Sequence, residues 1–241
     1  SDLASQLNVT IYDMHGGSSV ASLTLPVVGN GYQEQDTVVD TPFDAFSGNA
    51  DMRAVGAVVV VVPSQDSVDA IIRMIATYGA PDSEPVVGVQ RRVIDDFTIN
   101  QGQHIRVTLN STVSPYHHII QSSSFAQHGC DTDSLIGCGR DMILEVTQGM
   151  TGRTFSDDIF SSNEFSYEGE WVIGTPKGGT SFNVLQYDGP DNTDVLNPQG
   201  LGGIDFTDGG LAAGLRVVAL SDLASQLNVT IYDMHAGSSV A

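Results

Sequence analysis

The chain alternates short apolar runs with turns that are rich in Gly, Asp, Asn and Pro. Val, Ile, Leu, Thr and Tyr dominate the runs, which is typical of β-strands. Within residues 7–14, the apolar Leu7, Val9 and Ile11 fall at every second position and share one face. This period of two predicts a strand with one buried side. Residues 57–62 are apolar at every position, which indicates a central strand that is covered on both faces.

The same criteria predict strands at 7–14, 19–28, 55–62, 68–78, 93–99, 104–110, 117–122, 141–146, 170–175, 182–188 and 215–220. Segment 68–78 also has the apolar spacing of a helix, through Val68, Ile71 and Ile75. Its many β-branched residues favour a strand. This succession of strands predicts an all-β fold, an antiparallel β-sandwich or jelly roll.

The beginning of the chain recurs at its end. Residues 1–21 read SDLASQLNVTIYDMHGGSSVA, and residues 221–241 differ from them only in having Ala236 in place of Gly16. Ser1 aligns with Ser221, so the sandwich is predicted to repeat in tandem with a period of 220 residues. Two explanations are open: an array of near-identical units, or a strand copied to complete a neighbouring copy. Both predict contacts between copies of the chain, through Leu7, Val9 and Ile11 and their repeats Leu227, Val229 and Ile231.

A change in composition marks a candidate domain boundary. Residues 79–89, GAPDSEPVVGV, combine two prolines, two glycines and acidic residues, which indicates a linker. We therefore expect residues 1–80 to close one β-sandwich unit, 81–91 to be the linker and 92–241 to open the next unit. The strands that close the second unit would then come from another unit, which gives a head-to-tail fibre. The competing arrangement folds residues 1–78 back onto 92–220 as one closed domain.

The net charge is strongly negative. The chain has 9 Lys and Arg against 29 Asp and Glu, a formal charge of −20. Such a charge disfavours binding to nucleic acid or anionic membranes. No apolar run reaches the roughly 18 residues that a membrane-spanning helix needs. The charge suits solubility in a salty medium or the binding of cations, calcium above all, because calcium prefers carboxylate and carbonyl oxygens.

The turn DGPDNTD, residues 188–194, gathers the best candidate cation ligands, which are Asp188, Asp191, Asn192 and Asp194. Calcium is the one cofactor that the sequence predicts, although the spacing is not that of an EF-hand. The alternative is that these side chains only cap their own turn.

Cys130 and Cys138 are the two cysteines, and they are close enough in sequence to form a local disulfide. A zinc site with His128 is the alternative, but it lacks a fourth ligand. A disulfide implies an oxidising compartment and hence an extracellular location. Glycosylation is permitted at the Asn-x-Ser/Thr sequons of Asn8, Asn110 and Asn228.

The chain contains no motif of catalysis or phosphate binding, so we expect it not to be an enzyme. The adjacent His117 and His118 would point to opposite faces of a strand and could not share a metal. The pair Arg140–Asp141 either fixes a turn or contacts a sugar. Trp171, the single tryptophan, lies either in the core or in a sugar-binding platform.

Several motifs together resemble a known family. They are VIDDF (93–97), GCGRDMILEV (137–146), NVLQYDGPDNTD (183–194), LGGIDFTDGG (201–210) and FSGNADMRAVGA (46–57). Their order, wrapped through the repeat, resembles a jelly-roll domain of large, often repetitive, extracellular surface proteins of bacteria. Galactose-binding-like sandwiches are similar in general design, and some of them bind sugars. The segment CDTDSLIGC (130–138) is an insertion that the family pattern lacks.

The repeat, the charge and this resemblance predict a structural or adhesive repeat unit of an extracellular fibre, sheath or cell-surface protein. Its partners would be other copies of itself, joined head to tail in a filament. The alternative is a carbohydrate-binding module that takes glycans, since a shared fold does not define a function. A groove lined by exposed aromatic side chains would favour the module, and extensive burial between units would favour the fibre.

Overall fold

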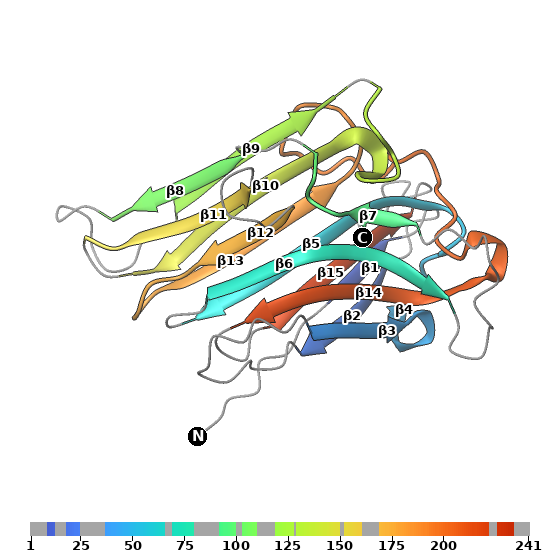
Figure 1. Ribbon diagram of the computed structural model, residues 1–241, viewed down its shortest axis with the longest axis horizontal. Helices are drawn as coiled ribbons and strands as arrows, with labels where there is room; N and C mark the ends of the chain where they lie inside the picture. Colours follow the sequence, from blue (N-terminus) through green and yellow to red (C-terminus); the bar gives the residue numbers. More distant parts are fainter. Residues whose placement is uncertain are drawn as a thin grey trace, which may run out of the picture.

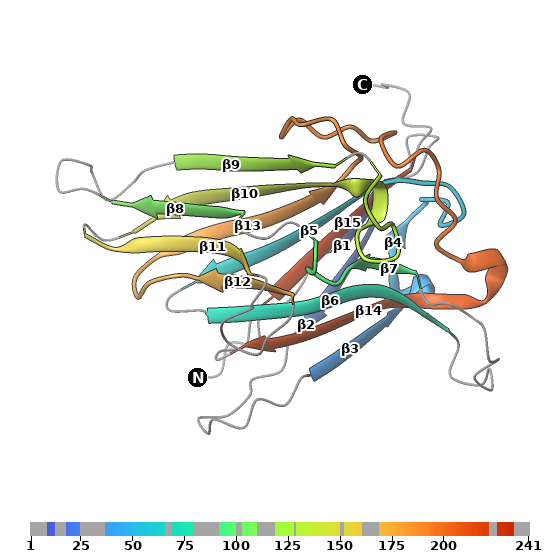
Figure 2. The ribbon, with the colours of Figure 1, turned by 45° about the horizontal axis from the view of Figure 1, so that its top comes forward.

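The structure is a computed structural model that describes residues 9–12, 18–24, 37–65, 69–79, 92–99, 103–109, 119–127, 129–149, 152–160, 169–221 and 226–233. Its strands form two sheets that stack face to face (Figures 1 and 2). The pairings between the described strands are antiparallel. The all-β sandwich predicted from the sequence is therefore confirmed.

The larger sheet runs from β2 through β15, β5, β13 and β10 to β9, and β1 and β4 also pair with β2. These strands are β1 (Val9–Tyr12), β2 (Ser18–Thr24), β4 (Ser47–Gly48), β5 (Val55–Gln65), β9 (Ile119–Ala126), β10 (Gly139–Gln148), β13 (Thr180–Tyr187) and β15 (Gln226–Asp233).

The smaller sheet has the order β3-β14-β6-β12-β11-β8, and β7 pairs with β6. Its strands are β3 (Thr37–Pro42), β6 (Asp69–Gly79), β7 (Val93–Asp95), β8 (His104–Thr108), β11 (Thr154–Phe160), β12 (Glu170–Gly174) and β14 (Ala212–Ser221). Three short 3₁₀ helices lie between strands: η1 (Phe43–Ala45), η2 (Ile136–Cys138) and η3 (Asp208–Gly210). Among the described residues, no helix has the length and hydropathy needed to cross a bilayer.

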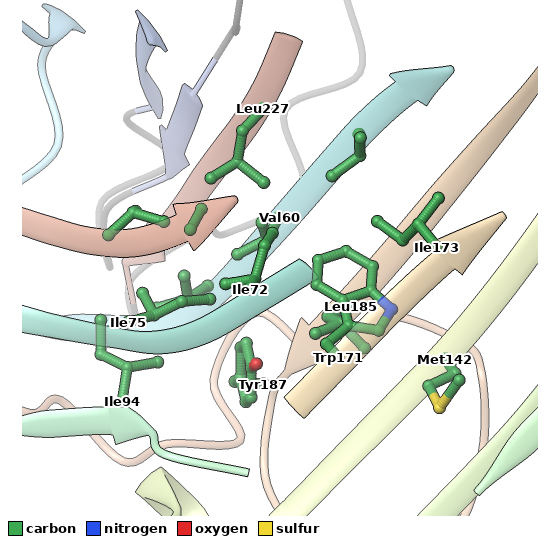
Figure 3. Packing of buried hydrophobic residues seen from close by; sticks show 14 of the residues in the cluster. Val60, Ile72, Ile75, Ile94, Met142, Trp171, Ile173, Leu185, Tyr187 and Leu227 are labelled. Atoms are coloured by element: carbon green, nitrogen blue, oxygen red, sulfur yellow. The ribbon is translucent and has the colours of Figure 1, made fainter. Parts of the chain in front are cut away.

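The core lies between the two sheets and is built from alternate residues of the strands. Figure 3 shows Leu227 of β15 and Val60 of β5 pointing into the same interior as Ile72 of β6 and Trp171 of β12. Each of these four side chains is fully buried. Segment 69–79 is a strand, so the alternative of a helix there is wrong. The apolar run at 57–62 lies in β5, a central strand that pairs with both β13 and β15.

The predicted division at residues 81–91 does not separate two units in this structure. β5 and β6 precede that segment, and they pair with β13, β12 and β14, which follow it. Strands from 1–80 and from 92–241 therefore share both sheets, as in the competing closed arrangement. The physical reason is the apolar character of β5: Val58 and Val60 have no exposed surface, because strands flank β5 on both sides and the smaller sheet covers one face.

The two copies of the repeated segment form β1 and β15, and both pair with β2 in the same register. Val9 and Val229 both lie opposite Ala21, and Ile11 and Ile231 both lie opposite Ser19. β4 pairs with the same strand. β15 also pairs with β5 along its length, and β1 lies close to β15 and β5 (Figure 1). Both copies thus pair with β2 in one register, and in the sheet order it is β15 that lies between β2 and β5.

Candidate functional site

The start of β10 separates two polar groups of the sandwich. Neighbouring residues of a strand point to opposite faces, so Arg140 points into the core and Asp141 points to the outer face of the larger sheet. Gly139 begins the strand, and a side chain at this position would meet the backbone of Gly189 and Pro190. The loop that follows β13 is therefore packed directly against the start of β10.

On the core side, Arg140 belongs to a buried hydrogen-bond network. Its guanidinium has no exposed surface and donates to the Asp95 carboxylate, to Ile99 O at 3.0 Å and to Gln103 Oε1 at 3.1 Å. Tyr187 Oη donates to the same Asp95 oxygen at 3.0 Å. A buried charge needs this degree of pairing, because an unpaired charge in the core is very costly. Arg140 therefore fixes the fold, and its burial argues against a contact with a sugar.

On the outer side, three carboxylates converge. Asp141 on β10 and Asp188 and Asp191 in the loop after β13 each bring one ligand atom to within 4.8 Å of the others. Asp141 and Asp188 are buried, and Asp191 is half-buried. One oxygen of Asp188, Oδ2, accepts a hydrogen bond from Asn197 N at 2.6 Å. Its other oxygen, Oδ1, is buried and has no hydrogen-bond partner among the described residues.

The electrostatics of this cluster are unfavourable for three negative charges. Burial raises the pKa of Asp141 to about 7; a hydrogen bond with Ser124 opposes the rise, and the charges of Asp188 and Asp191 add to it. Burial likewise raises the pKa of Asp188 to about 6; the N–H of Asn197 opposes the rise, and the charge of Asp191 adds to it. Three charged carboxylates are therefore disfavoured together here, and a proton or a cation would relieve their repulsion.

Glycines hold the loop in place. A side chain at Gly200 would overlap the carbonyl of Asp188, and one at Gly189 would overlap the carbonyl of Gly200. Gly189 also has a φ of +95°, which side-chain-bearing residues rarely adopt. Because these positions leave no room for a Cβ, the backbone on each side of Asp188 is held closely against neighbouring backbone.

The four calcium ligands that the sequence predicts do not all meet in one place. Asp188 and Asp191 lie in the cluster, whereas Asp194 is exposed and its Oδ2 accepts from Ser122 Oγ of β9 at 2.6 Å. Asn192 is exposed and has a φ of 59°. The turn-capping alternative also has support, since Asp191 Oδ1 accepts from Thr193 N at 3.0 Å.

Asp141 is not among the predicted calcium ligands, because in the sequence it stands out only through its pair with Arg140. The alternation of β10 carried a usable signal. In DMILEV the apolar Met142, Leu144 and Val146 form the buried face, and this places Asp141 on the other face of the strand. That β13 is the neighbour of β10, and brings Asp188 alongside, comes only from the sheet order.

The predicted disulfide between Cys130 and Cys138 is confirmed, and their Cα atoms lie 5.5 Å apart. Because the two sulfurs form this bond, neither is available as a zinc ligand. His117, His118 and His128 lie outside the described residues. The loop that the disulfide closes contacts the β7 region, where Asp96 N donates to Ser134 O at 3.1 Å. The disulfide thus stabilises the end of the sandwich that carries the Arg140 network.

Trp171 lies in the core, as one of the two interpretations predicted, and has no exposed surface. Its indole N–H donates to the Asp157 carboxylate, which is also fully buried. The large hydrophobic side chains that are exposed in the described part of the chain are all aliphatic, namely Val38, Ile120, Val195 and Leu211.

The residues predicted to join copies fall at the repeated strand. Leu227 and Ile231 of β15 have no exposed surface and belong to the core. Leu7 lies outside the described residues, as do the side chains of Val9, Ile11 and Val229 and the sequons of Asn8 and Asn110.

Comparison with known proteins adds no relative: no family model, no curated protein and no solved structure matches this chain.

Proposed function

We propose that the protein is a structural or adhesive repeat unit of an extracellular fibre or surface protein, and that it joins other copies of itself head to tail. The observation that carries the proposal is that the two copies of the repeated segment, β1 and β15, pair with β2 in the same register, while β15 fills the strand position between β2 and β5. One position holds one strand. Because the two copies share one register on β2, we infer that a chain with two copies has one copy more than the position between β2 and β5 needs.

The position is part of the core, and filling it has a large effect on stability. β15 completes hydrogen-bond ladders to β2 and to β5, and its Leu227 and Ile231 are fully buried. Burial of such side chains stabilises a fold by about 1.5–3 kcal/mol each. An empty position would also leave the edges of β2 and β5 unpaired, and unpaired edges attract strands from other chains. A unit with an empty position would thus bind a spare segment.

In a tandem array every strand position can be filled, because each 220-residue period carries one repeated segment and one position for it. The strand that closes one unit as β15 ends at Asp233, which corresponds to Asp13 of the next period. β2 of that next unit begins at Ser18. Residues 14–17 alone would connect neighbouring sandwiches, so the array would be a closely spaced row. The disulfide and the acidic surface suit an extracellular setting.

The proposal is tested by measuring whether a chain that lacks a functional segment binds a chain that has a spare one. We expect a variant with both segments disabled, Leu7→Asp, Ile11→Asp, Leu227→Asp and Ile231→Asp, to have an empty position. Mixed with the unaltered chain, which has a spare segment, it should form a one-to-one complex in size-exclusion chromatography with light scattering. A synthetic peptide of residues 221–241 should compete with this complex and should raise the melting temperature of the disabled variant.

Two matched controls separate segment exchange from nonspecific association. The variant Leu7→Asp/Ile11→Asp and the variant Leu227→Asp/Ile231→Asp each keep one intact segment, which their own position uses. Neither should bind the fully disabled variant, and both should remain folded and monomeric. If the disabled variant binds neither the unaltered chain nor the peptide, the segment does not join copies and the proposal fails.

The carbohydrate-binding alternative has less support from the structure. The tryptophan that would form a sugar platform is buried, and the exposed large hydrophobic residues among those described are not aromatic. Sugar-binding sites commonly rely on exposed aromatic faces, so the described surface offers no particular reason to prefer this function.

A further inference from the structure

We propose that Asp141, Asp188 and Asp191 form a calcium site that fastens the 188–200 loop to the outer face of the larger sheet. The proposal does not rest on the assembly of copies. Two separate observations carry it: the convergence of three carboxylates from two elements, and a buried oxygen, Asp188 Oδ1, with no hydrogen-bond donor among the described residues.

The spacing of the carboxylates fits calcium. Calcium binds oxygen ligands at about 2.3–2.6 Å, so two oxygens on opposite sides of the ion lie about 4.6–5.2 Å apart. The three ligand atoms here lie within 4.8 Å of one another. Magnesium binds oxygens at about 2.0–2.1 Å and requires a tighter, nearly octahedral set. Calcium accepts looser geometry and takes its remaining ligands from carbonyl groups and water.

The unsatisfied oxygen is the second observation. Asp188 has no exposed surface, and its Oδ1 has no donor, whereas Oδ2 is occupied by the N–H of Asn197. A buried carboxylate oxygen without a partner is strongly destabilising, and native structures rarely keep one. Three carboxylates that converge around an oxygen without a donor repel one another, and a bound cation or a proton would relieve this repulsion.

The site would have a definite structural effect. Asp141 lies on β10 opposite Ser124 of β9 and Gln186 of β13. The loop already reaches the same face, since Gln186 Nε2 donates to Asp194 O at 3.2 Å. An ion held by one strand residue and two loop residues would fix the loop across β9, β10 and β13. These three strands form the end of the sheet that lies farthest from the repeated segment.

The test is calcium binding by the full chain after treatment with a chelator, at mildly alkaline pH, where a proton competes least with the ion. Calorimetric titration should show one calcium ion bound per chain. The melting temperature should rise with calcium, because the ion binds only the folded state. Magnesium at the same concentration should produce a smaller rise. We expect Asp141→Asn and Asp188→Asn each to weaken calcium binding by at least about tenfold.

Asp194→Asn is the matched control, because Asp194 lies in the same loop but its carboxylate contacts Ser122 instead of the cluster. It should leave calcium affinity within about twofold of the unaltered chain. Asp191→Asn serves as a further ligand variant if Asp188→Asn does not fold. Absence of binding heat and of a melting-temperature shift in the unaltered chain would overturn the proposal and leave a proton shared by the carboxylates. Equal losses in the Asp194→Asn and Asp141→Asn variants would overturn it as well.

Discussion

Asp157 gives the sandwich a pH dependence that one substitution should remove. Its side chain has no exposed surface, one oxygen accepts from the Trp171 indole N–H, and Oδ2 has no partner among the described residues. Burial raises the pKa of Asp157 to about 8, against the hydrogen bond from Trp171 and with the help of the neighbouring Asp158 charge. At neutral pH the folded protein therefore carries this acid mostly in its neutral form.

The sign and the magnitude follow from proton linkage. An unfolded Asp has a pKa of about 3.9, so between about pH 4 and pH 8 the folded state binds the proton more tightly than the unfolded state does. The contribution of Asp157 to the free energy of unfolding consequently falls as pH rises through this range. The difference of about four pKa units, at about 1.4 kcal/mol each, amounts to about 6 kcal/mol in total, and about 4 kcal/mol of it falls between about pH 4.5 and pH 8.

Asp157→Asn should abolish this contribution, because the amide oxygen can still accept from Trp171 and the amide does not titrate. The free energy of unfolding in urea, followed by circular dichroism, should be similar in variant and unaltered chain at about pH 4.5. At about pH 8 the variant should be the more stable by about 4 kcal/mol. Asp133→Asn, at an exposed position, is the control and should show no such divergence. A stability difference between Asp157→Asn and the unaltered chain that does not change with pH would refute a neutral Asp157.

Three further substitutions probe other parts of the sandwich. Replacing Cys130 and Cys138 together by Ser should lower the free energy of unfolding by about 2.5 kcal/mol, as estimated for so short a closed loop, and denaturant titration measures this. Arg140→Leu should cost about 3–5 kcal/mol, because it leaves Asp95 as an unpaired buried charge; the loss should be smaller below the pH at which Asp95 takes up a proton. Tyr187→Phe should cost about 1–3 kcal/mol through the lost hydrogen bond to Asp95, and a cost near zero in thermal unfolding would show that this bond contributes nothing.

The sequence predicts the strands of this protein well where one face is apolar. Alternation predicted β1, β8 and β10, and an unbroken apolar run predicted β5. The strands that it missed have a physical reason for being missed. In β11, the buried face carries Asp157 between Phe155 and Ile159, so a polar residue occupies a core position and the alternation is lost. β3 and β4 are short and largely exposed, so neither carries a clear apolar face on which a prediction could rest.

Sequence could not predict which strands pair, because periodicity reports the face of a residue and not its neighbour. This limit explains why the prediction of the carboxylate cluster was incomplete. Proximity in the sequence grouped Asp188, Asp191, Asn192 and Asp194, but the third carboxylate of the cluster comes from β10, which only the sheet order places next to β13. The same limit affected the domain boundary, since the composition of residues 79–89 indicates a linker but not that the strands on both sides share two sheets.

The pairing of Ser18 with Tyr232 has a mechanical consequence for a fibre of such units. Tension would enter each sandwich at the first residue of β2 and leave it at the last residues of β15, and the register places these points side by side on neighbouring strands. A pull from there separates the β2–β15 ladder one residue pair at a time, whereas shear along the strands would load all pairs together. Each unit would open at low force and release up to roughly 750 Å of extended chain. A row of these sandwiches would therefore lengthen under load, unit by unit, before any covalent bond was strained.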